Sequence, residues 1–374
     1  MAVKLQVVSS LQDVDPASWD ALAGDDPFLR HAFLHALHDT GCACPETGWA
    51  PQYLLLQDGD ALAGAMPLYL KSHSYGEYVF DWAWADAYQR HGLEYYPKLL
   101  CAVPFTPVVG SRLLAGKPEH RELLAAGALE LARQTGTSSV HVLFPDAADL
   151  ECLTRLGFML RQGRQFHWHN RGYADFDDFL ARLSHDKRKK IRQERRRVRE
   201  AGIGFRWLEG KAISVEDWRF FSRCYRQTYR EHHSSPYLNL EFFLRIGAEM
   251  PQNLVMIQAL HGDRPIAASL LVRDDRRVCG RHWGAIEHHP LLHFEACYYQ
   301  GIEYAIARGL AIFEGGAQGE HKMARGLLPV ATQSAHWLAR PEFASAVERF
   351  LDREAGLMEA HSRELAARTP FKAD

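Results

Sequence analysis

The sequence predicts an α/β protein built from two domains of similar layout. The chain has 374 residues, 47% of them hydrophobic and 24% charged, which is enough for two hydrophobic cores at ~100–200 residues each. Apolar runs typical of strands alternate with helical periods along its whole length. The second half also repeats the element order of the first: two helices, a hairpin of strands, a longer helix and a further strand.

The first half opens with two short helices, each begun by an Asp-Pro pair. A strand hairpin follows, because Asp58-Gly59-Asp60 separates two apolar runs. The expected elements are helices at 15–19 and 26–41, strands at 53–57, 61–70 and 103–110, a helix at 119–134, a strand at 138–144, a short helix at 152–156 and a strand at 166–170.

The second half shows the same alternation, with a turn at His261-Gly262-Asp263 between two strands. Its expected elements are helices at 215–228 and 240–250, strands at 254–260, 266–272 and 278–285, a helix at 294–308 and a strand at 311–315. We place the domain boundary between residues 165 and 166. The N-terminal domain is then 1–165 and the C-terminal domain 166–374.

A strongly basic helix at residues 184–201 opens the second domain. Ser184 suits the N-cap and Gly202 ends the helix. Residues 185–199 hold nine Lys or Arg against two acids, a net +7 in a chain whose net charge is −2. This asymmetry favours a polyanion partner, although a solvated charged face or an import signal at 187–190 accounts for the same charges. The cations expected to contact phosphate are Lys187, Arg188, Lys190, Arg192, Arg195 and Arg196.

Composition limits the class and location of the protein. No run reaches the ~18 uncharged apolar residues of a membrane span, and the first ten residues lack a signal-peptide core. Seven scattered cysteines argue against a disulfide framework. We therefore expect a cytoplasmic protein with reduced cysteines.

Residues 261–272, the strand at 278–285 and the helix at 294–308 resemble the central strands and helix of a GNAT-type acyltransferase domain. Two such domains with the basic segment 187–202 between them resemble the Fem family of peptidyltransferases. The whole chain is most similar to the FemAB-like branch, the peptidoglycan biosynthesis/recognition proteins. The resemblance implies two tandem GNAT-like domains and transfer of an amino acid from aminoacyl-tRNA to a peptidoglycan precursor.

The sequence departs from GNAT enzymes that use acetyl-CoA at the pyrophosphate-binding loop. In those enzymes the backbone amides of a glycine-rich loop ahead of a helix hold the pyrophosphate. This arrangement resembles other anion-binding sites at helix N-termini. Residues 286–294 contain no glycine and include Pro290, which has no amide hydrogen. Acetyl-CoA is therefore not expected in the second half, whereas residues 110–116 leave it open in the first.

The segment 313–322 is the densest polar and glycine-bearing loop of the chain, and its glycines let backbone approach a ligand closely. The Fem family has a catalytically important lysine after the corresponding strand, and Lys322 stands at the matching position. The resemblance implies that its positive charge would stabilise the oxyanion formed during acyl transfer. Glu314, Glu320 and His321 are the candidates for taking a proton from an attacking amine. Gly315, Gly316 and Gln318 would line the substrate. The alternative is a turn with exposed charges and no function.

Further substrate contacts are expected from aromatic and polar clusters. Core packing is the favoured alternative for the aromatics of the strand at 278–285 and of the helix at 294–308, and it is also an alternative for the cluster of the first half. In the second half they are Arg281, His282, Trp283, Tyr225, Tyr229, Tyr237 and Tyr298; in the first half they are Asp81, Trp84, Tyr96 and Lys98. His288, His289 and His293 have spacings that suit a metal, but Pro290 interrupts them, so no metal site is predicted.

The sequence therefore predicts an acyltransferase that moves an aminoacyl or other acyl group to an amine by direct attack. Aminoacyl-tRNA is the expected donor, tRNA the expected macromolecular partner and an amine-bearing peptidoglycan precursor the expected acceptor. The rival predictions are an acetyl-CoA-dependent N-acetyltransferase and a non-catalytic scaffold that binds polyanions. The sequence leaves the oligomeric state open.

Overall fold

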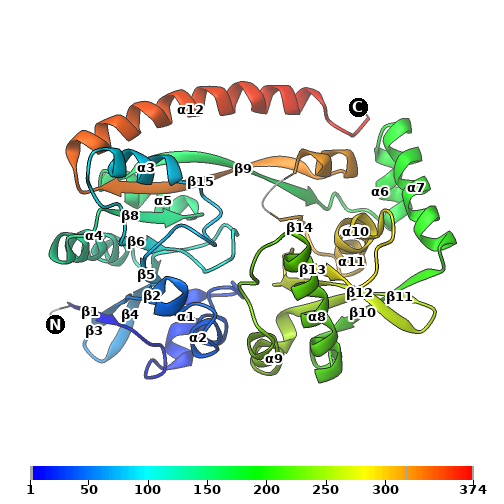
Figure 1. Ribbon diagram of the computed structural model, residues 1–374, viewed down its shortest axis with the longest axis horizontal. Helices are drawn as coiled ribbons and strands as arrows, with labels where there is room; N and C mark the ends of the chain where they lie inside the picture. The colour runs from blue at the N-terminus through cyan, green and yellow to red at the C-terminus, as the bar shows by residue number, and fades with distance from the viewer. Residues whose placement is uncertain (1–2, 317–318, 373–374) are drawn as a thin grey trace. The chain divides into compact units, whose positions relative to one another are not determined.

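The computed structural model describes residues 3–316 and 319–372, which form two compact units (Figure 1). Unit 1 consists of Met1–Gly163 and Ala331–His361, and unit 2 consists of Arg164–Val330 and Ser362–Asp374. Strands β9 (Met159–His169) and β15 (Leu328–Leu338) each contribute residues to both units. Both units combine sheets and helices, as an α/β protein requires.

Unit 1 contains two groups of strands. The first is a four-stranded antiparallel sheet in the order β1-β3-β4-β7, and the second runs from the C-terminal part of β15 through β8, β6 and β5 to β2. Only the β6–β8 pair of this second group is parallel. The strands are β1 (Val3–Val8), β2 (Trp49–Pro51), β3 (Tyr53–Asp58), β4 (Ala61–Met66), β5 (Leu68–Lys71), β6 (Lys98–Cys101), β7 (Leu114–Ala115) and β8 (Ser139–Leu143).

The helices of unit 1 pack their apolar faces on these strands. Leu124, Ala128 and Ala132 of α4 are buried in one core with strand residues such as Leu56 and Val140. The helices are α1 (Pro16–Ala23), α2 (His31–Asp39), α3 (Trp82–Arg90), α4 (Pro118–Thr135), α5 (Ala147–Arg155) and the part of α12 (Pro341–Ala367) that lies before residue 362.

Two predictions for unit 1 are wrong, and proline explains both. The predicted strand 61–70 is two strands, because Pro67 has no amide hydrogen for the ladder and lies where β4 leaves one sheet and β5 enters the other. The predicted strand 103–110 is irregular. Pro104 and Pro107 interrupt it, and Phe105 turns the backbone with a φ of 59°.

Unit 2 has a single group of strands in the order β10-β11-β12-β13-β14-β9, antiparallel except for the β13–β14 pair. Its core joins Trp168 of β9 and Phe313 of β14 to Ile302 and Tyr304 of α11, the helix that precedes β14. The strands are β10 (Ile203–Glu209), β11 (Leu254–His261), β12 (Arg264–Arg273), β13 (Arg277–Ala285) and β14 (Ile312–Glu314).

The helices of unit 2 are α6 (Phe176–Arg182), α7 (His185–Glu200), α8 (Val215–Glu231), α9 (Leu240–Glu249), α10 (Leu292–Phe294) and α11 (Gln300–Ala307). A π-helical turn, Glu295–Tyr299, joins α10 to α11, so the predicted helix 294–308 is not a regular α-helix.

Helix α8 packs closely on β13. A Cβ on Gly284 would lie 2.1 Å from the Cys224 carbonyl oxygen, so only glycine fits there.

No helix within residues 3–316 and 319–372 has both the length and the apolar character needed to cross a membrane.

A buried ionic cluster lies in the core of unit 1. The Lys98 ammonium is fully buried and donates to Glu77 Oε2 and Ser74 Oγ, both at 2.8 Å, and also to Asp81. Burial alone would lower the pKa of Lys98, but Glu77 and Asp81 raise it above its ordinary value. Burial raises the pKa of Glu77 to about 7. The charge of Lys98 is therefore needed to hold two buried carboxyl groups.

Lys71 is equally buried and lies 3.7 Å from the centroid of the Trp49 ring. Its ammonium donates to the Tyr75 carbonyl at 3.4 Å. Burial lowers the pKa of Lys71 to about 7, so the folded state favours the neutral amine.

We expect Lys98→Met and Lys71→Met to change stability in opposite directions. Lys98→Met leaves two carboxyl groups buried without their cation and should lower the free energy of unfolding by about 3–5 kcal/mol. Lys71→Met removes a buried amine whose folded pKa is depressed. That amine lowers stability below about pH 7 and does so progressively less toward pH 10.5.

Lys71→Met should therefore raise the free energy of unfolding at pH 6 by roughly 1–3 kcal/mol, after allowance for the lost cation–π contact. The gain should shrink as the pH rises toward 10. Urea unfolding of both variants at pH 6 and pH 9 measures this, and equal losses in the two variants would contradict it.

Candidate active site

The candidate site begins where β14 ends. Gly315 and Gly316 follow Glu314, and a short 3-10 helix, Glu320–Arg325, returns the chain toward β15 and is called the Lys322 turn below. A Cβ on Gly315 would lie 2.6 Å from the Leu327 side chain, and Gly316 has a φ of 88°, so both positions suit glycine. The predicted contact Gln318 lies outside the described residues.

Lys322 is held inside unit 2 at this turn. It is 2% exposed, and its Nζ donates to the Gly316 carbonyl at 2.8 Å. Burial lowers the pKa of Lys322 to about 8, and the nearby Cys297 thiol opposes this shift. The ammonium form therefore predominates at neutral pH and is lost within the mildly alkaline range.

His321 adjoins Lys322 but is exposed. Its Nε2 lies 3.3 Å from the Tyr298 hydroxyl. Loss of hydration lowers the pKa of His321, and the cations Arg325 and Lys322 lower it further, so the ring is mostly neutral at pH 7. The structure thus brings together predicted residues Lys322, His321, Tyr298 and Gly316.

The two predicted carboxylates have different surroundings. Glu314 is 5% exposed, accepts from Arg277 Nη1 at 3.3 Å and has its Oε2 3.9 Å from His167 Nε2. Glu320 is exposed at the start of the turn. Of the three proposed proton acceptors, His321 lies at hydrogen-bonding distance from Tyr298, whereas Glu314 is ion-paired in the interior.

A buried ion pair connects the turn to α7. Glu194 of α7 is 7% exposed and accepts from Arg325 Nη2 at 3.1 Å, and it also accepts from the Tyr299 hydroxyl. The Arg325 guanidinium lies 3.5 Å from the centroid of the Phe294 ring. Sequence reasoning missed Glu194 and Arg325. The available signal was the spacing of Glu194 from Ile191 and Val198, which places an acid on the apolar stripe.

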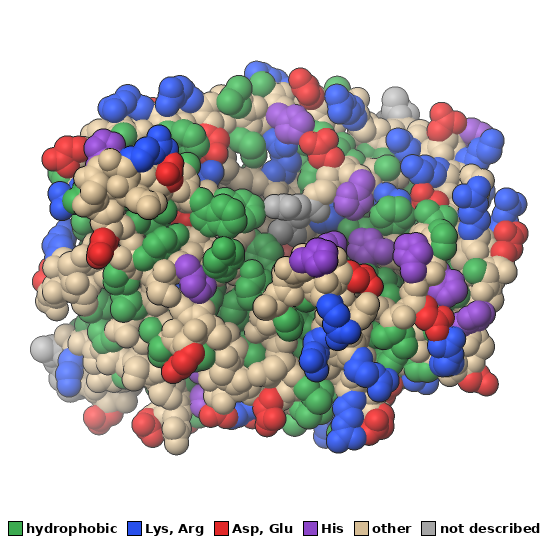
Figure 2. Space-filling model, in the orientation of Figure 1, with side chains coloured by type: hydrophobic (Ala, Val, Ile, Leu, Met, Phe, Trp, Pro, Cys, Tyr) green, Lys and Arg blue, Asp and Glu red, His purple; other side chains and the backbone are tan. Residues whose placement is uncertain are grey.

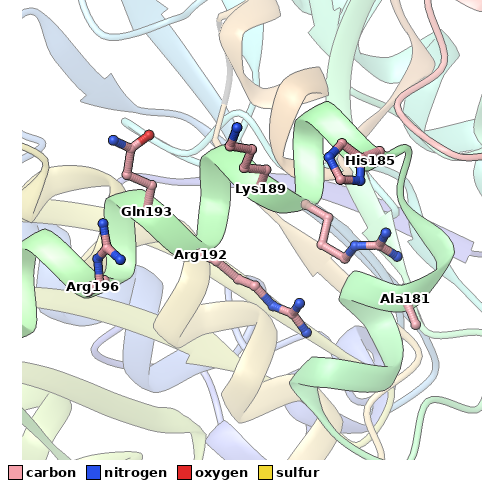
Figure 3. A pocket seen from close by; sticks show the side chains of 7 residues that line it. Ala181, His185, Lys189, Arg192, Gln193 and Arg196 are labelled. Carbon is pink, nitrogen blue, oxygen red and sulfur yellow. The ribbon is translucent and has the colours of Figure 1, made fainter.

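The opposite face of α7 is basic. A cavity of about 520 Å³ runs beside it, and Figure 3 shows His185, Lys189, Gln193 and Arg196 along α7, with Ala181 on α6. Arg188 and Arg192 complete this lining. Figure 2 shows Lys and Arg side chains at the edge where Figure 1 places α7.

The predicted phosphate contacts divide between the two faces of α7. Arg195 points inward, where it pairs with Glu295 at 2.9 Å and Glu303 at 2.5 Å and lies 4.3 Å from the centroid of Phe176. Arg192 pairs with the exposed Asp177 at 3.0 Å. Lys187 and Lys190 lie on the same helix outside the cavity lining, and Lys190 Nζ is 4.0 Å from Glu194.

A second cavity, of about 500 Å³, lies between the end of α8 and the loop that follows β13. Its lining includes Trp283, His293 and Phe294. The His293 ring centroid is 5.5 Å from that of Tyr298, so this cavity adjoins the Lys322 turn. Burial lowers the pKa of His293 to about 4, which keeps the ring neutral.

The remaining predicted contacts of unit 2 are mainly packed side chains. The ring centroids of His282 and Tyr225 are 5.2 Å apart, and burial holds the pKa of His282 well below its usual value. Tyr229 and Tyr237 have ring centroids 5.9 Å apart, and Arg281 is half-buried on β13. Their predicted role in substrate binding stays a prediction.

The four predicted contacts of unit 1 lie together in or beside the buried ionic cluster. Asp81 pairs with Lys98, Trp84 is 5% exposed against His336, and the Tyr96 hydroxyl is 2.8 Å from Ser74 Oγ. Internal pairing accounts for these positions, and substrate binding by them stays a prediction.

Comparison with solved structures shows the fold. FemX matches with a TM-score of 0.55 at 11% identity, over 93% of this chain and 100% of its own. L-PGS from Bacillus licheniformis matches with a TM-score of 0.55 at 12% identity, over 90% and 97%. The C-terminal domain of a putative lysylphosphatidylglycerol synthetase from Agrobacterium fabrum gives 0.53 at 8% identity, over 90% and 96%.

The predicted α/β class with tandem GNAT-like domains is confirmed. Among curated proteins, none matches the chain significantly.

The family comparison extends over nearly the whole chain. The FemAB-like model, described as peptidoglycan biosynthesis/recognition, matches residues 10–373. Together with the fold, this match supports an acyltransferase in the context of peptidoglycan. The chain belongs to the FemAB-like family.

Proposed function

We propose that this protein transfers an aminoacyl group from aminoacyl-tRNA to a free amine of a peptidoglycan precursor. The observation that carries the proposal is the buried Lys322 ammonium, fixed on the Gly316 carbonyl beside His321 and Tyr298. A cation in such a place interacts more strongly with developing negative charge, because little water is present to screen the two charges.

The proposed reaction is attack of the acceptor amine on the ester carbonyl that joins the amino acid to the tRNA ribose. The C–N bond forms, and the carbonyl oxygen becomes an oxyanion that the Lys322 ammonium stabilises. His321 takes the proton from the attacking nitrogen. When the ester C–O bond breaks, that proton goes to the departing ribose oxygen, so charge and atoms balance without a covalent enzyme intermediate.

The basic face of α7 supports tRNA as the source of the acyl group. Arg188, Lys189 and Arg196 line one cavity, and their charges suit several phosphates rather than one carboxylate. On its opposite face, the same helix carries Glu194, which binds Arg325 of the Lys322 turn. Phosphate contacts on α7 would therefore hold the donor on the element that also supports the turn.

Acetyl-CoA is the less favoured donor. The loop between β13 and α10, where a GNAT enzyme would present glycine amides, contains no glycine and includes Pro290. Leu291 there has a φ of 71°, the left-handed conformation that glycine adopts most easily. Calorimetry with acetyl-CoA should show no binding, and tight binding would favour the acetyltransferase.

We expect Lys322→Ala to lower kcat/KM by about 10²–10³, because one oxyanion-stabilising group is removed. The assay follows amide formation from tRNA charged with radiolabelled amino acids and a peptidoglycan precursor bearing a free amine. Lys211→Ala, which removes an exposed lysine of the same unit, is the control and should leave the rate unchanged. Wild-type rates in a folded Lys322→Ala protein would contradict the assignment.

The rate should have a bell-shaped dependence on pH. Lys322 must be protonated, so activity should fall as the pH rises through about 8. His321 must be neutral, so activity should rise on an acidic limb below pH 6.5. His321→Gln should abolish the acidic limb and retain the alkaline one. An alkaline limb that persists in the residual activity of Lys322→Ala would exclude Lys322 as its source.

The combined variant Arg188→Ala, Lys189→Ala and Arg196→Ala should weaken tRNA binding and reduce its salt dependence. The slope of log affinity against log salt should fall by roughly one for each phosphate contact removed. Filter binding from 50 to 200 mM salt measures this, with Lys211→Ala as the matched control. An unchanged slope would show that tRNA does not bind α7, whereas transfer activity tests the chemistry independently.

A further inference from the structure

A cluster of potential metal ligands lies where β11 and β13 end in unit 2. His261 is the last residue of β11, and Glu287 and His289 belong to the loop between β13 and α10. One ligand atom from each side chain lies within 4.8 Å of the other two. His289 Nε2 is 3.4 Å from Glu287 Oε2, and the ring centroids of His261 and His289 are 5.7 Å apart.

We propose that His261, Glu287 and His289 bind a divalent transition-metal ion of the zinc class. Two imidazoles and one carboxylate suit zinc, nickel or copper, whereas magnesium and calcium prefer ligand sets made of oxygen. Three protein ligands leave one position of a tetrahedral site for water or another oxygen donor. The ligand atoms lie within 4.8 Å of one another, against roughly 3.4 Å in a tetrahedral site with bonds of about 2.0–2.1 Å, so binding requires the side chains to move together.

The backbone holds the two contributing segments together without a metal. His261 pairs with Arg264 at the end of the β11–β12 hairpin, and the Ile286 amide donates to the Ile266 carbonyl at 2.9 Å. The His261 ring also packs on Gly202, where a Cβ would lie 3.4 Å from the ring. The site is therefore largely arranged before any ion binds.

Arg264 is the competitor for the metal. Its guanidinium pairs with Glu287 and lowers the pKa of that carboxyl group. The side chain of Arg264 is 59% exposed, so it can leave the carboxylate at little energetic expense. Metal binding then exchanges one surface ion pair for one coordination bond.

The site borders the 500 Å³ cavity, because Glu287 and His289 are among the residues that line it. Figure 2 shows histidine side chains gathered on the visible face in the region where Figure 1 places α10. A bound ion would add a positive charge to the wall of this cavity and fix the loop that forms it. This inference does not depend on the proposed transfer reaction.

The test is a calorimetric titration with ZnCl₂ of the untagged protein, from which metal has first been removed with a chelator. Replacement of a ligand should weaken zinc binding by about tenfold or more, so His261→Ala and His289→Ala should each show this loss. His288→Ala is the matched control, because it removes the neighbouring histidine outside the cluster and should preserve the affinity. Arg264→Ala should tighten binding, since it frees the carboxylate.

Cobalt substitution supplies a second readout that does not depend on activity. The visible absorption of bound Co²⁺ should disappear in His289→Ala and remain in His288→Ala. The proposal is overturned if His261→Ala binds zinc as tightly as the wild type, or if His288→Ala loses as much affinity as His289→Ala. A thiolate charge-transfer band that persists in His289→Ala would assign the metal to a cysteine and also overturn it.

Discussion

The ion pair between Glu194 and Arg325 is the interaction on which the candidate site depends. It lies inside unit 2 and joins two segments that are far apart in the sequence, the basic helix α7 and the turn that carries Lys322. A buried carboxylate requires its cation, so the helix and the turn cannot separate without leaving a charge unpaired. The basic surface and the buried lysine are thereby parts of one arrangement, although the sequence presents them as separate motifs.

The two units use buried lysines in different ways. In unit 1, Lys98 is surrounded by two carboxyl groups, and the resulting network is closed on itself. In unit 2, Lys322 has a backbone carbonyl as its partner and no carboxylate at hydrogen-bonding distance among the described residues. A cation that is only partly neutralised is the better one for chemistry, because its charge remains available to a ligand. This difference, rather than burial, separates Lys322 from Lys98, and Lys71, which also donates to a backbone carbonyl, shares it with Lys322.

Local patterns in the sequence were sufficient to predict the α/β class, the long helix α4 and the basic helix α7, since caps, periodicity and turn residues act over a few positions. Strand β15 escaped prediction, because Pro329 and polar residues such as Ser334 and His336 obscure its alternation. Both side chains are buried. Ser334 Oγ lies 2.8 Å from His336 Nε2 on the same strand, and His336 Nδ1 lies 2.7 Å from Nδ1 of His141, which is far away in the sequence. In the same way, the family resemblance suggested Lys322 but not the pairing of Arg325 with Glu194, because pairing between residues so far apart in the sequence is decided by tertiary packing.

The π-helical turn Glu295–Tyr299 determines how this part of the chain would respond to the deletion of a residue. A π turn holds one more residue than an α-helical turn would, which rotates the following side chains around the helix axis. Consecutive tyrosines therefore serve different neighbours: Tyr298 contacts His321, and Tyr299 contacts Glu194. Loss of a single residue from this turn would restore a regular helix and withdraw both tyrosines together. A deletion here would therefore change both contacts at once, whereas a substitution of one tyrosine changes only the contact of that residue.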